Sequence, residues 1–164
     1  MSKAILIIDH GSMREAANHM LDCVAALVQQ LAGDDVIVRA AHMELAEPSI
    51  AQGFADCVAA GATEVVVFPY MLSPGKHSTR DIPRMVAAAA ARAPGVRYCV
   101  TPAFGVHEKL AEVVLERSGV PVVGAAPQPA TCVRPAGAPE CWCDEACRAS
   151  DAGARDTAAA TSSR

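Results

Sequence analysis

The chain has 164 residues, of which 52% are hydrophobic, and this is enough to bury the core of one domain. Its net charge of −4 at pH 7 argues against a nucleic-acid-binding protein, because such proteins concentrate Lys and Arg on their binding surfaces. Its apolar runs are shorter than the roughly 20 residues that span a bilayer, and Met1-Ser2-Lys3 leads directly into a predicted strand without a signal-peptide pattern. These features predict a cytoplasmic protein that binds neither nucleic acid nor membrane.

Apolar runs typical of buried strands alternate with helical patterns along the first 118 residues. The predicted strands are 4–9, 36–42, 64–69 and 96–101, and 120–123 is a candidate fifth strand. The predicted helices are about 14–32, 48–60, 79–93 and 107–118. This alternation predicts an α/β three-layer sandwich with a mainly parallel sheet of four to five strands.

The composition changes after residue 123, so we predict a domain at 1–123 and a flexible tail at 124–164. The tail is rich in Ala, Pro and Gly, and it carries four cysteines, Cys132, Cys141, Cys143 and Cys147. Their spacing matches neither a zinc ribbon nor a bacterial ferredoxin, which leaves bound zinc, an iron–sulfur cluster or free thiols as alternatives. Cys23, Cys57 and Cys99 lie among apolar neighbours and are expected to be small buried hydrophobic residues.

Two histidines follow buried strands of the predicted sheet. His10 comes directly after the first strand, and His77 lies in the loop after the third. Open α/β sheets bind ligands beyond the carboxyl ends of their strands, so we expect the two imidazoles to meet there. Neutral imidazoles bind divalent transition metals, which makes this edge a predicted metal site. His107 begins the last helix and is expected to have a capping or surface role.

Three stretches that follow predicted strands are similar to a known family. They are Ile-Asp-His-Gly-Ser at 8–12, His-Met-Glu-Leu-Ala-Glu-Pro-Ser-Ile at 42–50, and Gly-x-His-x-x-x-Asp-Ile-Pro at 75–83. Together they resemble the small class II chelatases of the CbiX/SirB type, which insert a divalent metal into sirohydrochlorin. The resemblance covers residues 3 to about 120 and implies a chelatase-like half domain. It also implies that His10 and His77 bind the metal and that Glu44 assists proton removal.

The resemblance further implies a lyase of cobalamin or siroheme biosynthesis that acts as a homodimer around its anionic tetrapyrrole. We expect Co²⁺ as the inserted metal, with Fe²⁺ and Ni²⁺ as alternatives. The expected substrate-binding residues are Ser12, Arg14, Lys76, Ser78, Thr79 and Arg80. Met13 stands where many relatives have Arg. His42 stands at a position that is usually apolar in relatives, so whether it adds a third imidazole to the metal site stays open. The alternative from another class is a metallochaperone without catalytic activity.

Overall fold

The computed structural model describes residues 2–125, so the four tail cysteines lie outside the described residues. The chain divides into two units, Met1–Ala103 and Phe104–Arg164, which are described separately. Among the described residues, no helix is both long and apolar enough to cross a bilayer.

The first unit is built on a four-stranded parallel sheet, as predicted. Its strands are β1 (Lys3–Asp9), β2 (Val36–His42), β3 (Glu64–Pro69) and β4 (Arg97–Val100), in the order β2-β1-β3-β4. Each strand begins and ends within one residue of its predicted bounds. The candidate fifth strand at 120–123 is wrong: among the described residues this segment forms no strand and joins no sheet. Pro121 has no N–H to donate to a neighbouring strand, which opposes such pairing.

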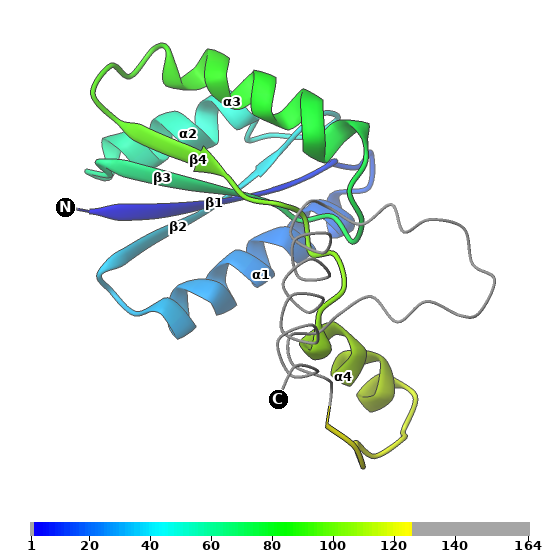
Figure 1. Cartoon of the computed structure of the whole chain (residues 1–164). Coiled ribbons are helices and arrows are strands. Elements are labelled where there is room, and N and C mark those ends of the chain that lie inside the picture. The colour runs from blue at the N-terminus through cyan, green and yellow to red at the C-terminus, as the bar shows by residue number, and fades with distance from the viewer. Residues whose placement is uncertain (1, 126–164) are drawn as a thin grey trace, which may run out of the picture. The chain divides into compact units, whose positions relative to one another are not determined.

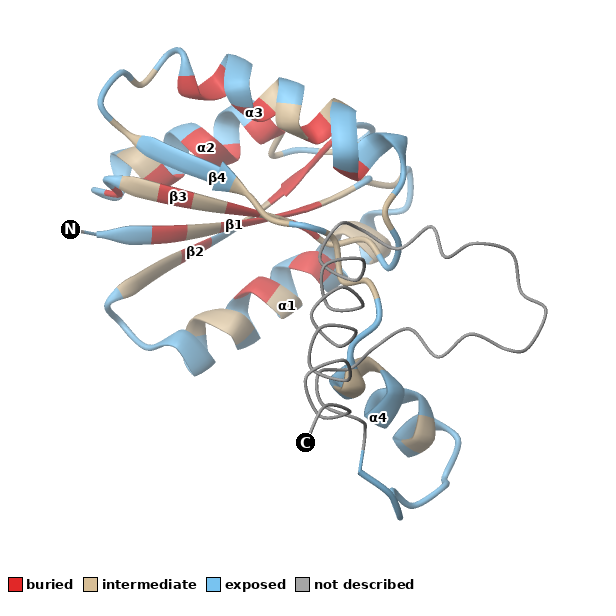
Figure 2. Cartoon of the chain, viewed as in Figure 1, coloured by how far each residue is buried: buried red, intermediate tan, exposed pale blue. Residues whose placement is uncertain are grey.

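Helices cover both faces of this sheet, which gives the predicted three layers. Figure 1 shows α1 (Glu15–Ala32) on one face and α2 (Ile50–Ala59) and α3 (Ile82–Ala90) on the other. Leu21 of α1 is buried against the first face, whereas Phe54 of α2 and Val86 of α3 belong to the larger core on the second. Figure 2 shows the same division, with buried residues on the sides of the helices that face the sheet.

The first turns of α2 and α3 differ from the predicted helix starts because local hydrogen bonds decide where each helix begins. The α2 helix begins at Ile50, since Ser49 and Gln52 form a reciprocal capping box one residue earlier. The predicted third helix begins with a π-helical turn, His77–Asp81, that continues directly into α3. Such turns are rare and are often found at functional sites.

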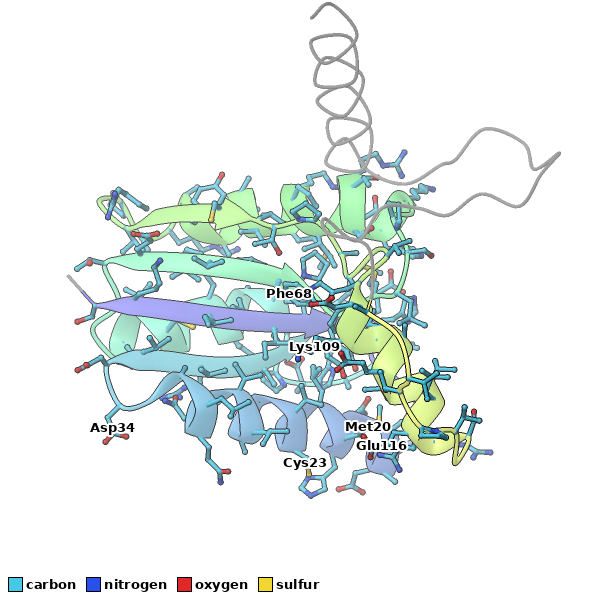
Figure 3. All side chains as sticks on the ribbon, turned by 60° about the horizontal axis from the view of Figure 1, so that its bottom comes forward. Met20, Cys23, Asp34, Phe68, Lys109 and Glu116 are labelled. Atoms are coloured by element: carbon cyan, nitrogen blue, oxygen red, sulfur yellow. The ribbon has the colours of Figure 1, made fainter. Side chains whose placement is uncertain are left out.

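The three cysteines outside the tail are not all buried, so the prediction for Cys23 and Cys99 is wrong. Cys57 of α2 is buried, and desolvation raises the pKa of its thiol to about 11. Cys23 is exposed because it lies on the side of α1 that faces away from the sheet (Figure 3). Cys99 is exposed because β4 is a short edge strand with three exposed residues of four.

The second unit contains α4 (Glu108–Arg117). His107 is its N-cap residue, and its Nδ1 accepts a hydrogen bond of 3.1 Å from the backbone N–H of Lys109. The expectation of a capping or surface role for His107 is therefore confirmed.

Candidate active site

The candidate site lies beyond the carboxyl ends of β1 and β3, which are neighbours in the sheet. From β1 the chain passes through α1 to β2 on one side, and from β3 it passes through α3 to β4 on the other. The connections that leave these two strands diverge, which creates the crevice where parallel α/β sheets bind ligands. His10 follows β1 directly, and His77 begins the π-helical turn after β3.

The structure brings the imidazoles of His10 and His77 together. Their ring centroids lie 5.3 Å apart, with 69° between the ring planes. Both residues are exposed, so a ligand from solvent can reach them. Residues 67 positions apart in the chain meet here only because β1 and β3 run in parallel with Ile8 opposite Pro69.

Each of these imidazoles has one ring nitrogen already engaged. His77 Nδ1 lies 3.1 Å from Asp81 Oδ2, and His10 Nδ1 lies 3.3 Å from the carbonyl oxygen of Gly11. Carboxylate and carbonyl oxygens only accept hydrogen bonds, so each Nδ1 carries a hydrogen, and in the neutral form of each ring Nε2 has the free lone pair. Metal-binding histidines in proteins typically have this arrangement, because the bonded oxygen orients the ring.

The Asp81 carboxylate that orients His77 is held in its charged form. Desolvation acts to raise its pKa, but hydrogen bonds from Arg80 and His77 and the charges of Arg80 and Lys76 outweigh it. The pKa of Asp81 therefore lies below its ordinary value. Arg80 contributes through a hydrogen bond of 3.1 Å from Nε to Asp81 Oδ1.

The turn after β1 is locked to the turn after β2. The backbone N–H of Glu44 donates to the carbonyl oxygen of His10 at 3.0 Å, and Met43 bonds in the same way to Asp9. Gly11 has a φ of +82°, and a Cβ at this position would lie 1.9 Å from the carbonyl oxygen of Glu44. Only glycine fits, so the backbone places exposed Glu44 beside the His10 turn.

His42 is the third imidazole of this region, and it is almost completely buried, with 2% of its surface exposed. Its Nδ1 lies 2.6 Å from Asp9 Oδ1, which also accepts the backbone N–H of Gly11 at 2.9 Å. Asp9 and His42 are also direct partners in the pairing of β1 with β2. Two of the family-like stretches, 8–12 and 42–50, contain these residues, but sequence analysis did not predict the bond between them.

Asn18 is a second residue that sequence analysis missed. Its side chain accepts a hydrogen bond from the backbone N–H of Ser12 at 2.8 Å and donates one to the Ser12 carbonyl at 2.9 Å. The first turn of α1 needs this support, because its N-cap residue, Arg14, makes no side-chain capping bond. Arg14 is left exposed beside Ser12, where a bound anion can reach it.

The predicted substrate-binding residues after β3 divide into two groups. Ser78 is buried, and its hydroxyl bonds to both the N–H and the carbonyl of Gly75, while Thr79 bonds to the same carbonyl at 2.8 Å. These hydroxyls hold the loop in shape. Lys76 and Arg80 are exposed, and although Arg80 Nε is bonded to Asp81, the other two nitrogens of its guanidinium can meet an anion.

Within the described part of the chain, no three side chains of His, Cys, Asp or Glu converge closely enough to enclose a metal ion. His10 and His77 alone leave most coordination positions of an ion open. This suits a site that must release its metal to another ligand.

Comparison with known proteins places this geometry in a family. The sequence profile described as CbiX matches residues 4–119. Sirohydrochlorin ferrochelatase, chloroplastic, from Arabidopsis thaliana is 45% identical over 69% of this chain and 50% of its own length. Sirohydrochlorin ferrochelatase from Bacillus subtilis is 34% identical over 76% of this chain and 49% of its own. A sirohydrochlorin cobaltochelatase from Priestia megaterium is 31% identical over 70% of this chain and 37% of its own length.

Solved structures agree with the sequence comparisons. SirB from Bacillus subtilis subspecies spizizenii, in complex with cobalt, superposes with a TM-score of 0.64 at 30% identity, over 73% of this chain and 50% of SirB. A CbiX protein from Marinobacter aquaeolei VT8 has a TM-score of 0.60 at 23% identity, over 71% of this chain and 94% of its own. At this identity the match shows a shared fold. The chain thus spans about half the length of the curated relatives first matched and of SirB.

Proposed function

We propose that this chain, which belongs to the CbiX family, inserts a divalent metal ion into sirohydrochlorin. The observation that carries the proposal is the pair of imidazoles at the crevice of the sheet, 5.3 Å apart and each with Nδ1 engaged. The names of relatives that are up to 45% identical, ferrochelatases and cobaltochelatases of sirohydrochlorin, support the same activity.

The chemistry needs a weakly held metal and a proton acceptor. Insertion replaces two pyrrole N–H protons with one M²⁺, so the metal must leave the protein as the macrocycle binds it. Two neutral imidazoles bind Co²⁺, Fe²⁺ or Ni²⁺ and leave positions open for pyrrole nitrogens. Glu44, beside the His10 turn, is our candidate for the group that assists proton removal.

The substrate carries eight carboxylates, and the chain is acidic overall, so binding requires local cations. Arg80, on the π-helical turn that also carries His77, and Lys76, the N-cap residue of that turn, supply them. Arg14, at the start of α1, is a third candidate.

We also propose that the enzyme works as a homodimer. The chain spans about half the length of its curated relatives, which is consistent with a second copy taking the place of their other half. His10 and His77 are exposed in a single copy, and a second copy that faced them would enclose a macrocycle between the two sheets. Light scattering of the purified protein, with and without sirohydrochlorin, measures the oligomeric state directly.

The activity is tested by adding Co²⁺, Fe²⁺ or Ni²⁺ to protein and sirohydrochlorin and following the absorption spectrum of the tetrapyrrole. We expect turnover above the spontaneous rate, with Co²⁺ as the predicted metal. His10→Ala and His77→Ala should each remove most of it while the protein stays folded. His107→Asn is the matched control, because it removes an imidazole but keeps an N-cap acceptor. Near-wild-type rates in either site variant would exclude the ligand assignment.

A second measurement separates the cations from the metal ligands. Lys76→Ala and Arg80→Ala should raise the KM for sirohydrochlorin, because they hold carboxylates in the ground state as well as in the transition state. Arg92→Ala should leave KM unchanged, because Arg92 is an exposed cation in the turn that follows the C-terminal end of α3. Metal binding without turnover that is unaffected by Lys76→Ala and Arg80→Ala would indicate a metallochaperone instead.

A further inference from the structure

One oxygen atom joins the turn that carries His10 to the end of β2. Asp9 Oδ1 accepts the backbone N–H of Gly11 at 2.9 Å and also lies 2.6 Å from His42 Nδ1. Because a carboxylate only accepts hydrogen bonds, His42 Nδ1 is the donor. The first bond shapes the turn around His10, and the second fixes that turn to the neighbouring strand. The function proposed above assigns no role to either Asp9 or His42.

His42 is the more firmly held member of this pair. Its side chain is only 2% exposed, and its backbone N–H donates to the carbonyl oxygen of Pro48 at 2.8 Å. Its backbone also forms a parallel bridge with Ser49, the N-cap residue of α2. The start of α2 therefore holds His42 in place. An imidazole held in this way can fix the Asp9 carboxylate, whose side chain is 22% exposed.

Asp9 lies where the two turns that carry the proposed chemistry are joined. Its carbonyl oxygen accepts the backbone N–H of Met43 at 3.0 Å, and the carbonyl oxygen of His10 accepts that of Glu44 at 3.0 Å. These bonds connect the turn of the proposed metal ligand to the turn of the proposed proton acceptor. The bond from His42 to Asp9 is a side-chain bond at the same junction. Its loss should therefore alter the position of His10 relative to Glu44.

Stability alone does not explain a polar pair at this place. Desolvation offsets most of the attraction between two buried polar or charged groups, and apolar residues of similar size often replace such pairs without loss of stability. The pair instead provides direction, because a hydrogen bond of 2.6 Å fixes the orientation of the carboxylate, whereas an apolar contact would let it rotate. That orientation decides whether Asp9 Oδ1 can accept the Gly11 N–H.

We propose that His42 and Asp9 form a positioning pair, which holds the His10 turn in the place relative to Glu44 that metal insertion requires. In this role neither residue touches the metal or the substrate. Both act through the backbone of His10 and Gly11. The effect of the pair on catalysis rests on the proposed function, whereas its effect on the Gly11 N–H is independent of any activity.

Amide hydrogen exchange of the full chain, followed by NMR, tests the pair without reference to activity. In His42→Leu, which removes the donor and keeps apolar bulk, the N–H groups of Gly11 and Glu44 should exchange about tenfold faster. The N–H of Thr79, which is bonded within the loop of His77, is the internal reference and should not change. His42→Asn should restore slow exchange, because its amide can donate to Asp9. Unchanged exchange of the Gly11 N–H in His42→Leu would overturn the proposal.

In the metal-insertion assay, a positioning role predicts a loss in kcat and not in substrate binding. His42→Leu should lower kcat about tenfold, because displaced reacting groups have effects of this order. The KM for sirohydrochlorin should stay unchanged, since Lys76 and Arg80 lie on another loop. His42→Asn should recover most of the rate. Val65→Ala is the control for stability: Val65 is buried at the amino end of β3, so its truncation should destabilise the fold and leave kcat unchanged.

A double-mutant cycle shows whether the two residues act as a unit. Asp9→Ala combined with His42→Leu should lower kcat no further than Asp9→Ala alone, because each change breaks the same bond. Losses that multiply would contradict the pair, and so would faster exchange of the Gly11 N–H with an unchanged kcat. If the wild-type chain inserts no metal, the proposed function fails, and the exchange measurement still decides whether His42 and Asp9 hold the turn.

Discussion

Gly11 determines how closely the His10 turn can approach Glu44. Its α-hydrogen faces the Glu44 carbonyl at a place where a Cβ would lie 1.9 Å from that oxygen. This contact is with backbone, so it cannot be relieved by a side-chain rotation. A substitution must therefore separate the two turns that carry the proposed metal ligand and the proposed acid.

We predict that Gly11→Ala lowers the rate of metal insertion about 100-fold, because small displacements of reacting groups have effects of this size. Gly33→Ala is the control, since Gly33 has a similar φ of +78° but open space around its Cβ position. It carries the backbone strain without the collision. Similar losses of activity in both variants would show that backbone strain alone is responsible. Unfolding in urea measures how much each substitution lowers the free energy of unfolding.

Asp81 is expected to make the folded protein sensitive to acid. Its pKa is lowered in the folded state from an ordinary value of 3.8, so its stabilising contribution is present above that pH and is lost as the pH falls through the lower folded value. Asp81→Asn should therefore destabilise the protein at about pH 5, and the difference from wild type should shrink towards about pH 3. Urea unfolding at several pH values measures this. A difference that stays constant across the range would contradict the assignment.

The residues that sequence analysis found and those that it missed differ in how their positions are determined. His10 and His77 were predictable because a residue after a parallel strand must lie at the ligand-binding edge, whatever its side chain does. The bond between Asp9 and His42 depends on strand register and on side-chain rotamers, and Asn18 reaches Ser12 only through the angle at which α1 leaves the loop. These contacts are set by tertiary packing, which residue patterns do not encode directly.

At the scale of elements, α2 approaches the sheet closely enough to require a glycine on its inner face. A Cβ at Gly53 would lie 2.8 Å from Ala41 Cβ and 2.9 Å from Leu6 Cδ1. This contact places α2 over the carboxyl half of β1 and β2. It thereby supports the loop that carries Glu44.

We predict that Gly53→Ala destabilises the protein by about 1–2 kcal/mol, even though Ala is the better helix former by about 1 kcal/mol. Adding Ala41→Gly should recover part of the loss, because it removes one of the two colliding groups. Denaturation of the single and double variants gives the coupling between the positions. Purely additive effects would show that the collision is absorbed elsewhere.

Helix starts were less predictable than strands. The buried parallel strands appear as continuous apolar runs, so their bounds follow from hydrophobicity. The start of α2 instead depends on a capping box at Ser49, and α3 is preceded by a π-helical turn that no local pattern announces. That turn follows exposed Lys76, exposes His77 and Arg80 and buries Ser78, so the missed detail bears directly on the site.

At the scale of the whole molecule, the family profile ends at residue 119, before the Ala/Pro/Gly-rich tail begins. The residues that carry the proposed chemistry all lie before Ala103, within the first unit. We therefore expect a metal bound by His10 and His77 to need no ligand from the tail. Its four cysteines remain candidates for a separate zinc or iron–sulfur site.

We predict that a protein of residues 1–123 folds, dimerises and inserts metal at a rate within a few-fold of the full chain. The physical reason is compositional: from its sequence, we expect the Ala/Pro/Gly-rich tail to offer too little apolar surface to offset the conformational entropy of ordering it. Circular dichroism, light scattering and the sirohydrochlorin assay test the three properties separately. A full chain in which all four tail cysteines are replaced by Ser is the control, because it keeps the tail but removes its thiolates. If both proteins lose solubility and activity together, the cysteines hold a structural metal or cluster; if only the truncated protein fails, the tail contributes through packing instead.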